Sequence, residues 1–125
     1  MKNEDTRIMK EILAEKDGKM TKAEAASIIT FFALKNGFET GENGAWGLPA
    51  IHSRELNFTY ETEMTGETNW EEHRIGQKVK LSASTARMGW QGTPEDLIKT
   101  ADEIRRGAEL VRFLNSLELE WVETF

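Results

Sequence analysis

The chain has 125 residues, 16 of them basic and 22 acidic. Its net charge of −6 argues against duplex nucleic acid as a partner, because DNA-binding surfaces cluster lysine and arginine. No cysteine is present, so no disulfide can form, which fits a reducing compartment. The charged N-terminus and the shortness of every apolar run predict a cytoplasmic protein without signal peptide or membrane span, folded as a single domain over residues 1–125.

The first predicted element is a helix over residues 5–16, ended by Asp17 and Gly18. Its apolar residues form one face: Ile8, Met9, Ile12 and Leu13. A short turn leads to a second helix, and such a pair could be a DNA-binding helix-turn-helix. The exposed positions of the second helix offer few basic side chains, so packing of the two helices is favoured over DNA reading.

The second helix opens at Thr21, because Glu24 follows three residues later and the two predict a capping box. This helix is apolar most of the way round, so we expect it to be the central buried helix, with Phe32 in the core. At its end, we expect Gly37 in the left-handed cap conformation and Phe38 folded back onto the helix.

A glycine-rich segment and two strands follow. In residues 38–50, the pair Asn43-Gly44 is a tight-turn signal and predicts a short hairpin with Trp46 on its return arm. Residues 54–64 alternate apolar and polar side chains, as a half-buried strand does, and a second strand is predicted over residues 75–85. Glutamates on the outer face of the first strand and lysines on that of the second favour an antiparallel hairpin with one wet face.

Thr93 is the expected N-cap of a third helix, with Pro94 in its first turn and acidic residues after it. We expect an apolar stripe of this helix to pack on the sheet, formed by Leu97, Ala101, Ile104, Ala108 and Val111. Further apolar residues exceed what one sheet face requires and predict a homo-oligomer with a two-fold axis: Leu110, Phe113, Leu114 and Leu117. Residues 117–125 alternate apolar and acidic side chains and form either a closing strand, which is favoured, or a continuation of the helix.

This order of elements predicts an α+β fold. Two N-terminal helices precede a small, mainly antiparallel sheet. A long C-terminal helix then packs on that sheet, and the closing strand completes it.

No catalytic or metal-binding motif stands out. Glu71, Glu72 and His73 fall together, but a metal site needs more ligands at fixed spacing. The segment "GWQGT" is not the G-x-S-x-G turn that presents a nucleophilic serine. We therefore expect no enzymatic activity, no metal and no cofactor.

The segment "STARMGWQGTPEDL", residues 84–97, places Trp90 in a glycine loop between a strand and a helix. This order is similar to a phosphate cradle at a helix N-terminus. However, no Lys-Ser/Thr pair follows the loop, and Glu95 and Asp96 would repel a phosphate there. Trp90 is then either a structural plug over the end of the core, which is favoured, or part of a binding surface.

Tryptophans recur in loop-like contexts with arginines near two of them. Arg87 lies three residues before Trp90, and Arg74 lies four residues after Trp70. Aromatic faces stack on bases and cations, guanidinium groups bind phosphate or carboxylate, and both residue types dominate protein interfaces. The candidate ligand-binding residues are Trp46, Trp70, Arg74, Arg87, Trp90, Gln91, Arg105 and Arg106, with Arg112 as a further helix arginine.

In size, acidity and lack of cysteine, the chain resembles the short accessory proteins of bacteriophages. This resemblance implies a small binding protein, commonly oligomeric, that sequesters a signal nucleotide or blocks a host protein. The favoured hypothesis is sequestration of a small nucleotide-like ligand, with tryptophans stacking on its base and arginines neutralising its phosphate. The alternative is a protein-binding inhibitor or adaptor, an antagonist of a host factor or defence system, that uses an acidic, tryptophan-containing surface. A small enzyme ranks third.

Overall fold

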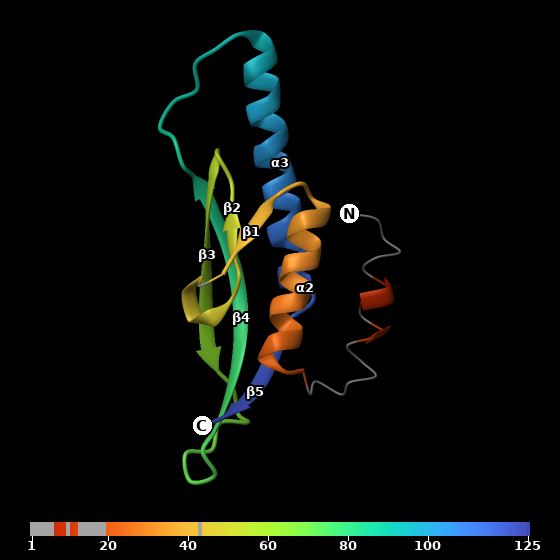
Figure 1. Cartoon of the computed structure of the whole chain (residues 1–125), viewed down its shortest axis with the longest axis vertical. Helices are drawn as coiled ribbons and strands as arrows, with labels where there is room; N and C mark the ends of the chain where they lie inside the picture. The colour runs from red at the N-terminus through yellow and green to blue at the C-terminus, as the bar shows by residue number, and fades with distance from the viewer. Residues whose placement is uncertain (1–6, 10, 13–19, 43) are drawn as a thin grey trace.

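Residues 7–9, 11–12, 20–42 and 44–125 are described by a computed structural model of the chain. A three-stranded antiparallel sheet of order β3-β4-β5 is covered on one face by two helices (Figure 1). Its strands are β3 (Leu56–Met64), β4 (Arg74–Thr85) and β5 (Glu120–Thr124). The helices are α2 (Lys22–Lys35) and α3 (Pro94–Ser116), and a separate hairpin joins β1 (Glu39–Gly41) to β2 (Ala50–His52). The α+β class and the closing strand are confirmed.

The first predicted helix falls only partly on described residues. Residues 7–9 and 11–12 are helical, whereas the rest of that prediction, including its end at Asp17 and Gly18, lies outside the described residues. Within the described part of the chain, no helix combines the length and the apolar character needed to cross a bilayer.

Helix α2 begins and ends as its sequence predicts. The Thr21 hydroxyl accepts from the Glu24 amide at 3.1 Å, and the Glu24 carboxylate accepts from the Thr21 amide at 3.3 Å. Gly37 adopts a φ of 83°, and the amide of buried Phe38 donates to the Ala33 carbonyl at 3.0 Å. The prediction of a helix buried most of the way round is wrong, because α2 leaves the apolar residues Phe31 and Leu34 exposed.

The β3–β4 hairpin is antiparallel and pairs opposite charges across its outer face, as predicted. Glu61 pairs with Lys80 and Glu63 with Lys78 on the outer face, where the Thr59 and Ser82 hydroxyls also lie 2.6 Å apart. Opposite charges therefore stand across the two strands on the solvated face. The other face carries the apolar side chains of both strands and contributes to the core.

The β1–β2 hairpin is hydrogen-bonded to β3 at the edge that does not pair with β4. Trp46 lies in the short 3-10 turn Ala45–Gly47 between the two strands, not on the return arm that the sequence suggested. Its indole donates to the Tyr60 carbonyl at 3.3 Å, and the Tyr60 hydroxyl donates to the Pro49 carbonyl at 2.6 Å. Of the predicted Asn43-Gly44 turn, Asn43 lies outside the described residues.

Helix α3 buries a different face from the one predicted. Its buried residues belong to the C-terminal half of the helix and the turn after it: Gly107, Leu110, Phe113, Leu114 and Leu117. Gly107 allows this approach, because a Cβ there would overlap the Leu56 side chain of β3. The predicted stripe instead remains exposed or half-buried along its length: Leu97, Ala101, Ile104, Ala108 and Val111.

The residues that suggested an oligomer lie in the core of one chain. Phe113 packs on Phe32 of α2 with ring centroids 4.5 Å apart, and Leu117 joins the same cluster next to the fully buried Trp121 of β5. The sheet alone does not cover them, because α2 packs on them from the other side through Phe32. An oligomer through these four residues is therefore no longer required to explain their apolar character.

Two adjacent phenylalanines of α2 test the core. Phe32 is 2% exposed and Phe31 is 58% exposed. Phe32→Ala should lower the free energy of unfolding by about 3–5 kcal/mol, because it leaves a cavity between α2 and α3. Phe31→Ala, the matched control, should cost about 1 kcal/mol or less. Urea denaturation measures both, and equal losses would contradict the assignment.

The cap of α3 gives a second test. Thr93 and Asp96 form a capping box, with the Thr93 hydroxyl accepting from the Asp96 amide at 3.2 Å. Thr93→Ala should lower the free energy of unfolding by about 1 kcal/mol. Thr93→Ser keeps the hydroxyl and should retain most of that stability, so equal losses in the two variants would rule out the cap as the cause.

Candidate functional site

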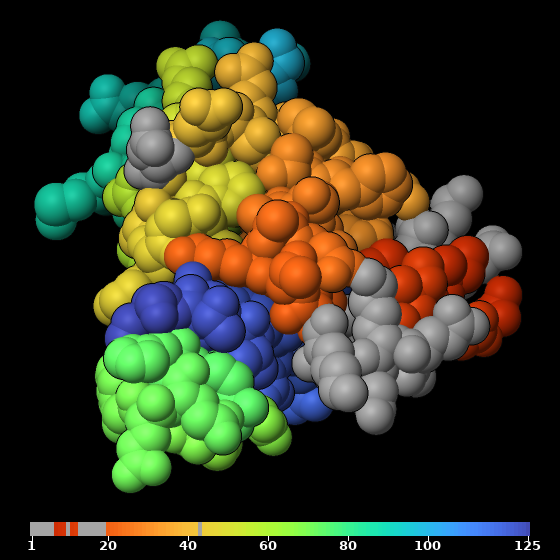
Figure 2. Space-filling view, turned by 60° about the horizontal axis from the view of Figure 1, so that its bottom comes forward, coloured from red at the N-terminus to blue at the C-terminus, as the bar shows by residue number. Residues whose placement is uncertain are grey.

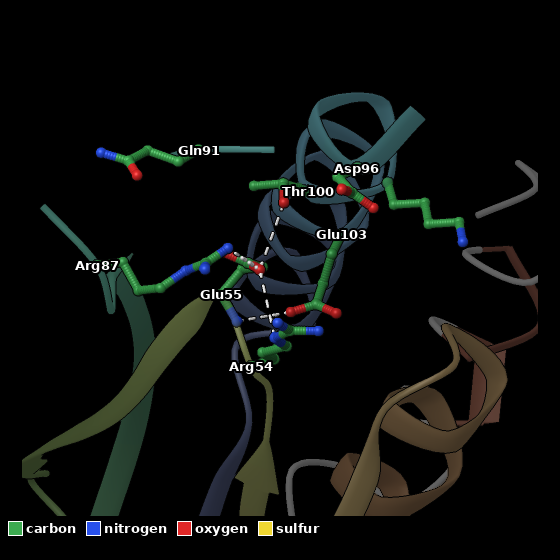
Figure 3. A pocket seen from close by; sticks show the side chains of 8 residues that line it. Arg54, Glu55, Arg87, Gln91, Asp96, Thr100 and Glu103 are labelled. Atoms are coloured by element: carbon green, nitrogen blue, oxygen red, sulfur yellow. Dashed lines mark hydrogen bonds and ion pairs between the residues drawn. The ribbon is translucent and has the colours of Figure 1, made fainter. Parts of the chain in front are cut away.

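The loop of residues 86–93 leaves the end of β4, arches outward and returns to the N-terminus of α3 (Figure 1). Arg87 of this loop turns toward the body of the protein and meets Glu55, immediately before β3 (Figure 3). Its Nε donates to Glu55 Oε2 at 3.0 Å and its Nη2 to Oε1 at 2.5 Å. The Glu55 side chain is only 5% exposed, so this two-bond ion pair is shielded from solvent on the carboxylate side.

Glu55 joins three parts of the chain. Its carboxylate binds Arg87 of the loop and accepts a long hydrogen bond from the Thr100 hydroxyl of α3 at 3.4 Å. Its amide donates to the Glu103 carboxylate at 2.7 Å, and its carbonyl accepts from Ala86 at 2.8 Å. The hydrogen bonds from Arg87 lower the pKa of the Glu55 carboxyl and outweigh burial, which raises it. The carboxylate is therefore held in its charged form.

A cavity of about 320 Å³ lies around this ion pair. Its lining is polar and of mixed charge: Arg54, Glu55, Arg87, Gln91, Asp96, Lys99, Thr100 and Glu103. The acidic groups already have internal donors, since Asp96 accepts from Thr93 and Glu103 accepts from the Ser53 hydroxyl. Hydrogen bonds from Thr93 lower the pKa of Asp96, which keeps its negative charge in the cavity. The cavity suits a small polar molecule better than a polyphosphate.

The predicted tryptophans do not meet at one site. Trp70 lies in the turn between β3 and β4, at the opposite end of the sheet from the Trp90 loop (Figure 1). That turn, in green, lies against the C-terminal strand, in blue (Figure 2), and the Trp70 and Phe125 rings stand 6.1 Å apart. Trp46 lies against Tyr60 of β3. The three indoles therefore belong to three separate surfaces.

Most of the predicted arginines have acidic partners on the same protein. Arg74 pairs with Glu72 at 2.9 Å, and Arg105 pairs with Asp102 at 2.8 Å. Arg106 also pairs with Asp102, donates to the Asn36 carbonyl at 2.6 Å and lies over the Phe38 ring. Of the predicted ligand-binding residues, only Arg87 and Gln91 line the polar cavity.

The plug interpretation of Trp90 is not supported by its burial. Trp90 is 43% exposed and takes no part in the core cluster. Three other large apolar side chains of the same end are also exposed: Met88, Leu97 and Ile98. We call Met88, Trp90, Leu97 and Ile98 the tip; four exposed large apolar side chains set it apart from an ordinary polar surface.

The alternation of polar and apolar residues does not reveal the pair that holds the loop. It places Glu55 on the polar face of its strand, like the glutamates that follow it, and the sequence assigns Arg87 to a ligand phosphate. The signal that could find the pair is the register of the β3–β4 hairpin, because Leu56 pairs with Thr85 and the Ala86 amide donates to the Glu55 carbonyl, next to Arg87. Lys99 and Glu103 likewise look like ordinary solvated residues of an acidic helix.

Within the described residues, no group of three His, Cys, Asp or Glu side chains could hold a metal ion. His73 directs its ring against Phe125, with centroids 5.2 Å apart. The chain matches no known protein family, and no curated protein or solved structure is significantly similar to it. Its function is inferred from its own geometry.

The Glu55–Arg87 pair predicts a pH dependence of stability. Because the pKa of Glu55 in the folded protein lies below its ordinary value of 4.5, the pair stabilises fully above pH 4.5 and loses its effect as the pH falls through the lowered value. Below pH 4.5 the melting temperature of the wild type should therefore fall more steeply than that of Glu55→Gln, which has no charge to lose. Parallel melting curves of the two proteins against pH would refute this role.

Proposed function

We propose that the protein is a non-enzymatic binding module that captures another protein through the tip. The observation that carries this proposal is the exposure of four large apolar side chains in one loop and the first turns of the helix after it. Apolar side chains exposed together on a small protein mark an interaction site more often than a catalytic one. Tryptophan is also the residue type most enriched among interface hot spots.

The Glu55–Arg87 ion pair supports the proposal by holding the loop. A loop fixed before binding loses less conformational freedom when its partner arrives, and affinity gains by that difference. Arg87 lies one residue before Met88 and three before Trp90, so its side chain anchors the segment that exposes them. The acidic residues Glu95 and Asp96 border the tip and favour a partner whose apolar cleft carries basic residues at its rim.

Loss of the tip should abolish capture. Met88→Ser combined with Trp90→Ala removes two exposed side chains. The double variant should bind the captured protein more than tenfold more weakly, which is the effect of losing a hot spot. Trp70→Ala is the matched control, since Trp70 is 60% exposed at the other end of the sheet. Affinity capture from cell lysate with native mass spectrometry identifies the partner, and titration of the purified pair measures the change. A partner retained equally by the double variant would reject the proposal.

A second candidate function is binding of a small ligand, a nucleotide-like molecule among others, in the polar cavity. Its support is that Arg87 and Gln91 line the same cavity as two further cations, Lys99 and Arg54. The Arg54 side chain is mostly exposed, although its Nε lies 4.0 Å from the Glu55 carboxylate. A ligand present at a hundred times its dissociation constant should stabilise the protein by about 2.7 kcal/mol. Thermal melting against linear and cyclic nucleotides tests this function, and Lys99→Ala should remove the shift whereas Trp70→Ala should not.

A further inference from the structure

Strand β4 is paired on both sides along only part of its length. β5 covers it from Arg74 to Lys78, and the Val79 amide still donates to the Leu119 carbonyl at 3.0 Å. At Leu81 the Asn115 side chain takes the place of a neighbouring strand, because it accepts from the Leu81 amide and donates to the Leu81 carbonyl, both at 2.8 Å.

Beyond Leu81 the edge of β4 is open. In an antiparallel ladder the backbone groups of alternate residues point to the same side, so those of Ala83 and Thr85 point away from β3, as those of Leu81 do. Neither residue has a hydrogen bond to the described part of the chain on that side, and both are exposed. Two residues therefore present unused donors and acceptors to solvent.

Helix α3 overhangs this edge. The stripe residues Ile104, Ala108 and Val111 line a groove of about 330 Å³ together with Leu56, Ala83 and Thr85. Asn115, which caps the edge at Leu81, continues the stripe at helical spacing, so the stripe follows the line along which a fourth strand would run. The groove thus has backbone hydrogen-bonding groups on one wall and apolar side chains on the other.

We infer that this groove is the interface of a two-fold dimer, in which the open β4 edges of two copies pair antiparallel near Ala83 and Ser84 and the two α3 stripes pack on each other. The two sheets then form one six-stranded sheet with both helix layers on the same face. Of the tip residues only Leu97 belongs to the stripe, and antiparallel α3 helices put the two tips at opposite ends of the dimer.

The sequence of the edge favours a second copy as its occupant. The segment "LSASTA", residues 81–86, is small and uncharged, and it carries no lysine, proline or glutamate, the residues by which proteins keep an edge unpaired. Self-pairing therefore places no like charges opposite each other. A two-fold axis is also the commonest symmetry of soluble oligomers, and it pairs the open β4 edge of each copy with that of the other.

The exposed surface of α3 also suits a two-fold dimer. Ala101 and Ala108 are exposed and small, so two α3 helices can approach closely over the paired edges. Arg112 lines the groove and forms no ion pair within the described residues. Because the partner helix runs in the opposite direction, its acidic N-terminal half, with Glu95 and Asp96, extends toward Arg112 of the first copy.

Sedimentation of the full chain tests the dimer. Wild type should sediment at twice its mass of 14.2 kDa, and Ala101→Glu with Ala108→Glu should sediment as a folded monomer, since glutamate preserves the helix but puts charge on the α3 stripe, at Ala108 within the groove. Ala23→Glu makes the same change at an exposed alanine of α2 and should remain a dimer. A monomeric wild type at millimolar concentration, or a dimer that survives the double substitution, would overturn the inference.

Cysteine cross-linking tests the register without relying on the folding of those variants. The chain has no cysteine, so a single one at Ala83 or Ser84 reports only on contact between two copies. Paired edge residues bring their Cα atoms to about 4.5–5.5 Å, within the range of a disulfide. At least one of the two variants should form a covalent dimer under mild oxidation, and Thr59→Cys on β3 should not. Equal cross-linking at all three positions would also overturn the inference.

Discussion

Burial of the C-terminal half of α3 is the constraint on which the rest of the structure depends. Leu110, Phe113 and Leu114 fill the space between the sheet and α2, and Gly107 lets the helix lie against Leu56. Helix α3 has 23 residues and its buried residues lie in this half, so its N-terminal half extends past the sheet beside the loop, with Thr100 and Glu103 bonded to Glu55 (Figure 1). The tip and the polar cavity lie along this projecting half, and the open groove begins where it ends, at Ile104 and Ala108.

The Glu55–Arg87 ion pair connects the projecting half to the body of the protein. A buried carboxylate without a partner is costly, and Arg87 is the partner that the loop supplies. The same contact weighs against the ligand-binding role expected of Arg87, since Glu55 balances its charge and uses two of the three guanidinium nitrogens. What the loop then offers to solvent is apolar, and this is why protein binding is favoured over sequestration of a charged nucleotide.

The sequence predicted those features of the fold that depend on neighbours within one turn of helix or across one hairpin. The capping residues Thr21 and Thr93 and the opposite charges across β3 and β4 are of this kind. It could not predict which face of α3 is buried, because the helix carries two apolar faces at equally good helical spacing. The buried face is selected by two contacts between residues distant in the chain. Gly107 lies against Leu56 of β3, and Phe113 packs on Phe32 of α2. The Glu55–Arg87 pair was missed for a different reason: it follows from the register of the β3–β4 hairpin, which sets Leu56 opposite Thr85, and alternation of polar and apolar residues alone does not determine that register.

Amide hydrogen exchange at the edge of β4 measures the central claim most directly. In the wild-type protein the amides of Ala83 and Thr85 should be protected, because the second copy's edge accepts their hydrogen bonds. In the variant with glutamate substituted at Ala101 and Ala108 they should exchange rapidly, whereas the Ala86 amide, bonded to the Glu55 carbonyl, should stay protected in both proteins. Rapid exchange of Ala83 and Thr85 in the wild type at every concentration would contradict the account.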